Sequence, residues 1–114
     1  MLDDMLYKYR GKVAAIHDWT DLTVNIDLGF NVWTVQRVVL EGVGMHIKPV
    51  DEVRQFIHRT VMKRRCWLDV RRPVHKGKQY TVVTLYYIDK KKDDEKPICL
   101  NTLLVDMGYV KPLR

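Results

Sequence analysis

A chain of 114 residues and 13.5 kDa has the size of one domain, because hydrophobic cores usually divide only in much longer chains. With 46% hydrophobic and 30% charged residues, the composition is that of a globular protein, which excludes intrinsic disorder and collagen-like structure. The length also excludes a two-domain enzyme with its own cofactor-binding half. We therefore expect a single domain over residues 1–114.

The net charge of +6 is distributed unevenly along the chain. Residues 1–52 contain five Lys and Arg against eight Asp and Glu, whereas residues 53–114 contain fifteen against six. Between Arg54 and Lys78, nine basic residues accompany one acid, Asp69. A field of this kind attracts polyanions, of which nucleic acid is the commonest. A solvated basic surface without a ligand is the alternative.

The first third of the chain has three segments rich in apolar β-formers, which predict strands over 7–16, 22–28 and 32–40. Residues 17–21 are a predicted turn between the first two strands, and residues 29–31 a predicted hairpin turn between the second and third. The chain is therefore expected to open as an antiparallel meander.

A helix of about three turns is predicted after Pro49. Proline and the acidic pair Asp51 and Glu52 suit a first helical turn, where N–H groups are unpaired and the dipole favours negative charge. The side chains that follow at helical spacing are Val53, Phe56, Ile57, Thr60 and Val61.

Two further strands and a short second helix complete the expected fold. The strands are predicted over 66–70 and 80–88, joined by a basic turn over 71–78. Apolar residues over 98–107 predict the helix, and Gly108 suits its C-terminal cap. This order of elements is typical of a small Greek-key barrel of the OB type. The expected class is therefore α+β, mainly β, with a five-stranded OB-fold barrel and two helices.

Several stretches of the sequence carry a resemblance to a known family. They are Tyr7 to Gly11, Ile26-Asp27-Leu28-Gly29-Phe30 with Trp33, Gln36-Arg37-Val38, and Cys99-Leu100-Asn101-Thr102-Leu103-Leu104 through Gly108 and Pro112. Along most of its length the chain resembles the staphylococcal-nuclease-like (thermonuclease) domain, especially the compact versions encoded by tailed phages. The resemblance implies an OB barrel that cleaves DNA and RNA with calcium held by carboxylates, a Glu as the proposed base and two Arg that stabilise the phosphate.

The first active-site motif of that family is only partly present. Where the family has Asp-Gly-Asp-Thr, this chain has Asp18-Trp19-Thr20-Asp21. The first Asp is kept, but the metal-binding second Asp falls on Thr20. Asp21 lies one residue further along the predicted turn.

The second and third motifs depart further. Val39 falls on the strand Arg, Gly44 on the metal-binding Asp and Ile47 on the Glu, while Tyr80-Thr81-Val82 replaces Tyr-Gly-Arg. Slipping the alignment by two residues brings Arg37 onto the Arg but places glycine and methionine at the two acids. No register restores the set.

An inactive, pseudo-nuclease domain follows from these departures. A hard divalent cation needs several oxygen ligands, and each missing stabilising group costs about two orders of magnitude in rate. We therefore expect no catalytic residue, no metal site and no cofactor in the degenerate region, which consists of Asp18, Thr20, Asp21, Val39, Gly44 and Ile47. Calcium would enter only with a weak residual phosphodiesterase based on Asp18, Asp21 and Glu41, which is a further alternative.

Nucleic-acid binding by the inactive domain is the leading functional hypothesis. The predicted binding residues are Lys63, Arg64, Arg65, Arg71, Arg72, Lys76 and Lys78. The first three end the predicted helix, where positive charge also complements the helix dipole. The other four lie in the basic turn, a loop of the kind with which OB folds follow a nucleic-acid backbone. The aromatic candidates for base stacking are Trp67, Tyr80, Tyr86 and Tyr87.

A protein-binding module that engages or inhibits a host protein is the alternative from another class. Trp19 stands where the family has Gly, so that a bulky apolar group covers the mouth of the former active site. The candidate partner surface consists of Trp19, Trp33, Met45 and His46. A packing role of Trp19 within the domain is equally compatible with the sequence.

The sequence also predicts the surroundings of the protein. No apolar run is long enough to span a bilayer, and Asp3 and Asp4 stand where a secretory signal has basic residues. Two isolated cysteines, Cys66 and Cys99, form neither a disulfide framework nor a zinc ribbon. We expect a cytoplasmic protein with reduced thiols and no membrane partner, located in the host cytoplasm if it is phage-encoded.

Overall fold

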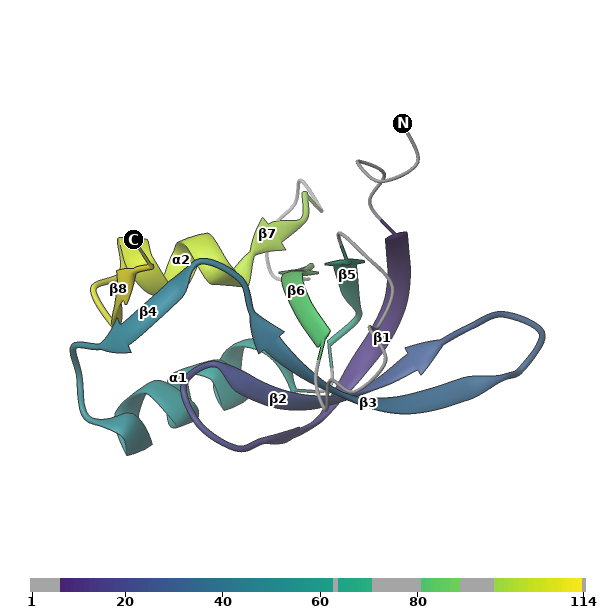
Figure 1. The fold of residues 1–114 in the computed structure, drawn as a ribbon, viewed down its shortest axis with the longest axis horizontal. Coiled ribbons are helices and arrows are strands. Elements are labelled where there is room, and N and C mark those ends of the chain that lie inside the picture. Colours follow the sequence, from purple (N-terminus) through teal and green to yellow (C-terminus); the bar gives the residue numbers. More distant parts are fainter. Residues whose placement is uncertain (1–6, 63, 71–80, 89–95, 114) are drawn as a thin grey trace.

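The computed structural model describes residues 7–62, 64–70, 81–88 and 96–113, which contain a closed five-stranded barrel (Figure 1). The barrel strands are β1 (Tyr7–Ile16), β2 (Asp21–Asp27), β3 (Trp33–Leu40), β5 (Cys66–Val70) and β6 (Thr81–Tyr87). Their order is β3-β2-β1-β5-β6, and parallel pairing of β3 with β6 closes the ring. All five strands lie within a residue of their predicted positions, so the mainly β, OB-like class is confirmed.

Alternating burial along the strands builds the core. In β2, Leu22, Val24 and Ile26 are buried, and the residues between them are partly exposed. At Gly11 in β1, an added Cβ would lie 2.7 Å from Leu68 Cδ1 and 2.9 Å from Val24 Cγ1. Glycine is required there because a side chain would displace both neighbours.

The helix α1 (Val50–Val61) confirms the predicted first helix. Its buried side chains are Val53, Ile57 and Val61, which recur every four residues on one face and join the barrel core. The helix starts after Pro49 and carries Asp51 in its first turn, as the sequence predicts.

The second helix, α2 (Leu100–Asp106), is shorter than predicted. Residues Ile98 and Cys99 belong instead to a short strand, β7 (Ile98–Cys99), because they pair with the end of β6. At the other end, Gly108 adopts a φ of +79°, and the N–H of Tyr109 donates to the carbonyl of Leu104 at 3.0 Å. This is a Schellman cap, which confirms the predicted role of Gly108.

A two-stranded ribbon outside the barrel was not predicted. It consists of β4 (Val43–His46) and β8 (Val110–Pro112), which pair antiparallel. Gly44 allows the close approach, because a Cβ at this position would lie 2.9 Å from the carbonyl oxygen of Lys111. The ribbon packs the loop after β3 against the segment that follows α2.

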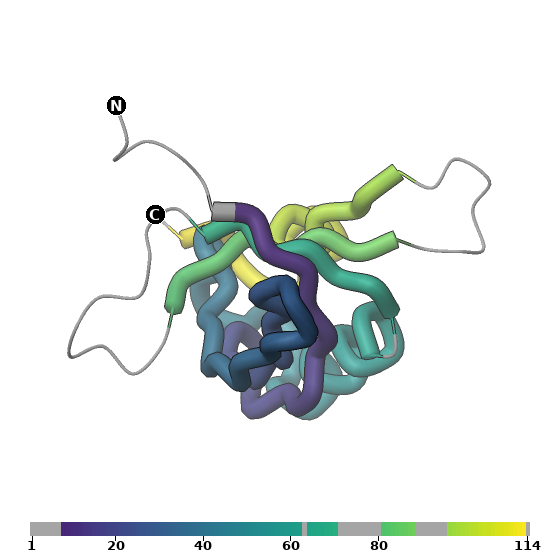
Figure 2. The backbone as a smooth tube through the Cα atoms, turned by 90° about the vertical axis from the view of Figure 1, so that its right-hand side faces the viewer, coloured from purple at the N-terminus to yellow at the C-terminus, as the bar shows by residue number. Residues whose placement is uncertain are grey.

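The β2–β3 hairpin extends beyond the barrel, and its tip points toward the viewer in Figure 2. The predicted turn is present: Leu28 and Val32 are joined by an N–H to carbonyl hydrogen bond of 2.8 Å. Phe30 and Asn31 have φ values of +54° and +62°, as the two central residues of a type I′ turn require. We call residues 28–36 the β2–β3 arm.

Two parts of the sequence prediction lie outside the described residues. They are the basic turn over 71–78 and Tyr80 at the start of the predicted fifth strand. Among the helices that the structure describes, none has the length and apolar character needed to cross a membrane.

Candidate functional site

The turn that aligns with the first nuclease motif is organised by Asp18. Its Oδ1 accepts hydrogen bonds from the backbone N–H groups of Thr20 and Asp21, each at 2.9 Å. The backbone N–H of His17 closes the same turn by donating to the carbonyl of Asp21 at 2.8 Å. Asp18 therefore acts as an Asx-turn residue that fixes the connection between β1 and β2.

Asp21 is held by a bidentate ion pair with Arg37. The guanidinium donates from Nε to Oδ1 at 2.9 Å and from Nη2 to Oδ2 at 2.7 Å. The hydrogen bond to Asp21 and its negative charge raise the pKa of Arg37 above its ordinary value. Both carboxylate oxygens of Asp21 are thus occupied by a cation of the protein itself. A metal ion at Asp21 would have to share these oxygens with the positive charge of Arg37, which opposes cation binding.

The remaining positions of the degenerate region supply no carboxylate. Val39 lies opposite Asp21 in the β2–β3 ladder, and Ile47 is exposed, with its N–H bound to the Tyr109 carbonyl at 2.8 Å. Gly44 is part of the β4–β8 ribbon. Within the described ranges, no three His, Cys, Asp or Glu side chains gather where they could hold a metal ion.

Trp19 packs into this end of the molecule. Its indole Nε1 donates to the carbonyl of Gly44 at 2.9 Å, and its ring meets His46 edge to face with 4.7 Å between centroids. His46 is fixed in turn by a 2.9 Å hydrogen bond between Nδ1 and the Lys48 carbonyl. The tryptophan thus ties the turn before β2 to β4, and the packing interpretation of Trp19 is the one that the contacts favour.

Asn101 completes the connections around the end of β3. It is buried on α2, where its Nδ2 donates to the carbonyls of Glu41 at 2.7 Å and Val83 at 3.1 Å. Its Oδ1 accepts from the N–H of Leu85 at 3.0 Å. One side chain therefore joins the segment after β3, the strand β6 and the helix α2. The sequence alone links Asn101 only to the family resemblance.

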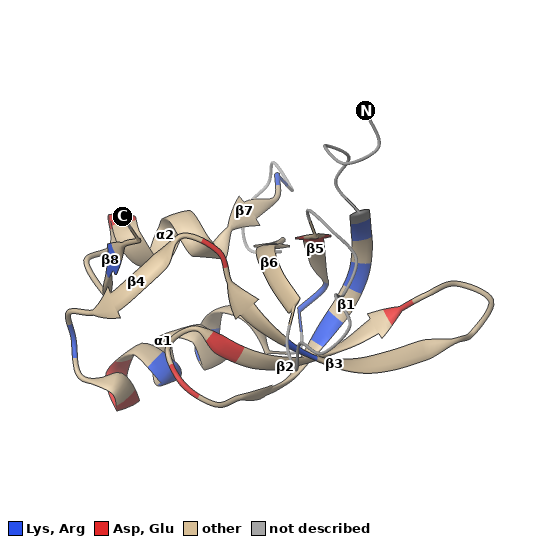
Figure 3. Cartoon of the chain, viewed as in Figure 1, with Lys and Arg blue, Asp and Glu red and all other residues tan. Residues whose placement is uncertain are grey.

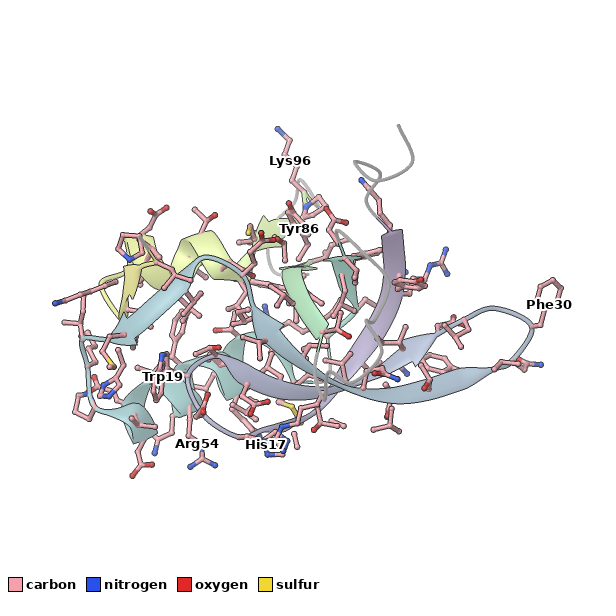
Figure 4. All side chains as sticks on the ribbon, in the orientation of Figure 1. His17, Trp19, Phe30, Arg54, Tyr86 and Lys96 are labelled. Carbon is pink, nitrogen blue, oxygen red and sulfur yellow. The ribbon has the colours of Figure 1, made fainter. Side chains whose placement is uncertain are left out.

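The four residues of the candidate partner surface do not form one patch. Trp19 and His46 are in contact, and the exposed Met45 lies beside them on β4. Trp33 pairs with Asp27 at the opposite end of β2. At roughly 3.3 Å per residue, the six steps from residue 21 to residue 27 separate the two ends by about 20 Å. Figure 4 shows this separation between the labelled Trp19 and the tip residue Phe30.

The predicted basic cluster is described only at Arg64 and Arg65. The guanidinium carbon of Arg64 lies 5.8 Å from the centre of the Tyr87 ring, and Arg65 is exposed just before β5. The other predicted residues, Lys63, Arg71, Arg72, Lys76 and Lys78, lie outside the described residues. Their role in binding stays a prediction.

A second basic surface, on β1, was missed by the sequence analysis. Lys8, Arg10 and Lys12 alternate with buried or half-buried residues and are all exposed on the outer face of the barrel (Figure 3). The signal in the sequence is the alternation of basic residues at every second position, which is the period of a strand.

Aromatic side chains lie next to this basic strand. The ladder places Arg10 opposite Trp67 of β5, and Trp67 opposite Tyr86 of β6. Directly opposed side chains share one face with their Cβ atoms about 5 Å apart. We call Lys8, Arg10, Lys12, Trp67 and Tyr86 the basic–aromatic face.

The two aromatic residues of this face are half-buried, with their rings partly accessible. Partial burial, followed by the nearby Cys99 and Asp69, raises the pKa of the Tyr86 hydroxyl above its ordinary value. A tyrosine is uncharged at neutral pH even without this shift. A neutral tyrosine and a tryptophan beside cationic side chains are the elements that bind unpaired bases and phosphates.

The cysteines are free, as the sequence predicts. Burial raises the pKa of the Cys66 thiol to about 12, and the neighbouring Arg64 lowers it only in part. The Sγ donates to the Arg64 carbonyl at 3.5 Å. Cys66 is therefore a protonated core residue and no nucleophile at neutral pH.

Comparison with models of known protein families finds no match, and a search of curated proteins finds no relative.

Proposed function

We propose that this OB-like domain binds nucleic acid through the basic–aromatic face. The observation that carries the proposal is the cross-strand row of Arg10, Trp67 and Tyr86, flanked along β1 by Lys8 and Lys12. In this arrangement the cations contact phosphates and the rings stack on unpaired bases.

Charge balance on the face supports this proposal. Alternation places the exposed Arg65 beside Lys12, which adds a fourth cation at the start of β5. Two acids lie on the same side, Asp69 opposite Lys8 and Asp27 opposite Arg10. Four cations against two acids leave a positive face, so that binding is expected to weaken steeply as salt concentration rises.

The proposal also takes in the basic turn predicted from the sequence, which lies outside the described residues. Arg71 and Arg72 follow β5 directly in the sequence, and Lys76 and Lys78 precede β6. The proposal therefore includes the residues named from the sequence and adds a β1 component to them. Binding is expected to be weakly sequence-specific, because phosphate contacts and stacking carry little base information.

The proposed domain does not cleave its ligand. The resemblance to staphylococcal-nuclease-like domains points to a phage-encoded pseudo-nuclease, and the Arg37 ion pair on Asp21 supports loss of the metal site. A weak calcium-dependent activity would require Asp21 to bind a metal ion beside the positive charge of Arg37.

Fluorescence anisotropy with labelled single-stranded DNA, duplex DNA and RNA, measured across a salt series, tests the proposal. We expect the double variant Arg10→Glu with Lys12→Glu to weaken binding by more than tenfold. The matched control is Arg59→Glu with Lys111→Glu, which makes the same charge change at two exposed positions outside the face. Because a general loss of positive charge would affect both pairs equally, equal weakening would contradict a defined face.

A second pair of variants separates the two basic surfaces. If Arg71→Glu with Arg72→Glu weakens binding while the β1 variants do not, the basic turn alone is the interface. If the chain binds none of the three ligands, the alternative of a host-protein partner gains support. Trp67→Leu should reduce affinity for single strands more than for duplex, because only unpaired bases can stack on the ring.

A further inference from the structure

The β2–β3 arm carries the largest concentration of exposed apolar side chains in the described residues. Of ten exposed large apolar side chains there, five lie in this arm. They are Leu28, Phe30, Val32, Trp33 and Val35. The arm contains no charged residue between Asp27 and Arg37, as the uniform tan colour of Figure 3 shows. Such a surface on a protein is typical of a contact site for another protein.

Along the same arm, one edge of β3 pairs with no strand among the described residues. The parallel pairing of β6 with β3 covers only Val38 to Leu40. From Trp33 to Arg37, β3 pairs with β2 on one side and with no other described strand on the other.

Hydrogen bonds nearby determine which backbone groups face this edge. The N–H of Leu40 donates toward β2, to the Thr20 carbonyl at 2.9 Å, whereas the N–H of Glu41 donates toward β6, to the Val83 carbonyl at 2.8 Å. Because these directions alternate along a strand, the N–H and carbonyl groups of Trp33, Val35 and Arg37 point to the open edge.

Most of this edge lacks the features with which monomeric proteins protect such strands, and its one charged residue, Arg37, is paired with Asp21. Lys, Pro, an inward-pointing charge or a bulge usually prevent an exposed edge from pairing with another chain. The sequence Trp33-Thr34-Val35-Gln36 contains no such residue, and its ladder to β2 runs without a register shift.

We propose that the occupant of this edge is a second copy of the same chain, paired antiparallel through β3. A two-fold axis at Val35 places Val35 opposite itself and Trp33 opposite Arg37 of the second copy. All three outward-facing residues then exchange N–H to carbonyl hydrogen bonds, six in total, because each is in a hydrogen-bonded pair position.

The side chains fit this arrangement as well as the backbone does. Trp33, Val35 and Arg37 share the outer face of the strand, and all three are exposed. Asp21 fixes the Arg37 guanidinium by two hydrogen bonds. In the dimer, each Arg37 guanidinium would lie against the Trp33 ring of the other copy in a cation–π contact. The edge is therefore complementary to itself in apolar character, and its one cation would meet a tryptophan and not a second cation. This proposal is independent of nucleic-acid binding.

Sedimentation equilibrium over a range of concentrations tests the proposal with the full chain. We expect the mass to rise from 13.5 kDa toward twice that value as concentration increases. Val35→Lys should weaken association at least tenfold by placing two cations together at the axis, and Val35→Pro should do so by removing the central outward N–H. Met45→Lys is the matched control, because Met45 is an equally exposed apolar residue on a strand at the other end of the molecule.

Amide hydrogen exchange of the unaltered protein gives a second readout, which does not depend on variants that fold. Protection of the Val35 N–H should increase with protein concentration, while that of Gln36, which faces β2, should stay constant. A monomeric mass at all concentrations would overturn the proposal. So would a dimer that persists in both Val35 variants or dissociates in Met45→Lys, because either result would place the interface elsewhere.

Discussion

The two ends of the β2–β3 hairpin are built in opposite ways. At one end, Asp18 fixes the turn, Asp21 is paired with Arg37, and Trp19 is bound to the carbonyl of Gly44. At the other end, the β2–β3 arm exposes apolar side chains and an open strand edge. Both ends belong to the same two strands, so local β-propensity does not produce the difference. The first end is in contact with the β4–β8 ribbon and α2, and we call it the packed end.

The part of the molecule that resembles a nuclease site and the part that is open to new contacts are therefore different. The residues that align with a nuclease site are occupied in hydrogen bonds and packing within the domain. The arm aligns with no catalytic motif. Its exposed apolar side chains and its strand edge are nevertheless the groups that can contact another molecule. The following predictions test that contrast, beginning with the largest expected effect.

Asn101→Ala should destabilise the protein by about 3 kcal/mol, because it removes three hydrogen bonds and leaves the buried N–H of Leu85 without a partner. The free energy of unfolding from urea titration measures this loss. Thr102→Ala is the control, since its side chain is exposed on the same helix. A loss of less than 1 kcal/mol would show that the packed end does not depend on this bridge.

The two tryptophans offer a direct comparison of one residue type at both ends. Trp19→Ala should cost about 2 kcal/mol, since it removes a hydrogen bond and partly buried ring surface. Trp33→Ala should stay within about 0.5 kcal/mol at protein concentrations low enough to keep the chain monomeric, because its side chain is half exposed. Equal losses in urea titrations of the two variants would remove the distinction between the ends.

Asp21→Ala should reduce stability less than Asn101→Ala or Trp19→Ala, because ion pairs in contact with solvent contribute little. The loss should shrink in high salt, which screens the pair in the unaltered protein. Gel analysis of labelled strands with calcium or EDTA tests the residual phosphodiesterase in the same variant. Cleavage that needs both calcium and Asp21 would revive the alternative of a working metal site.

Phe30→Asn should have the smallest effect and the opposite sign. The φ of +54° at Phe30 is unfavourable for a large side chain, whereas asparagine tolerates it, so a gain of about 0.5 kcal/mol is expected. Thermal unfolding of the dilute protein measures it. A clear loss of stability would mean that the Phe30 ring packs within the monomer, contrary to its full exposure.

The barrel strands and α1 could be predicted because their signals are local. Alternation in β2 and the four-residue spacing of Val53, Ile57 and Val61 are visible in short windows. The β4–β8 ribbon could not be predicted in this way, since Val43 pairs with Pro112 and neither segment is long enough to show a period. The strand β7 is also too short to show a period, so the predicted second helix includes its two residues, Ile98 and Cys99.

The candidate sites depended on register, which the sequence does not contain. The ion pair of Asp21 with Arg37 and the row of Arg10, Trp67 and Tyr86 appear only when the pairing of the strands is known. The alternation of cations in β1 is visible in the sequence. The excess of positive charge in residues 53–114 is larger, however, and the prediction of a binding site rested on it. Trp33 is exposed, and its place on a contact surface stays a prediction. Its distance from Trp19 depends on the pairing of β2 with β3, which the sequence does not contain.

The Asn101 bridge has a consequence for how quickly the barrel can form. Asn101 donates to the carbonyl of Glu41, which lies 60 positions earlier in the sequence. The strands β4 and β8, which pair with each other, are separated by a similar length of chain. Loops of this length lose much chain entropy on closing before any contact repays it. Folding is therefore expected to take milliseconds to seconds. If the bridge forms in the transition state, Asn101→Ala should slow refolding.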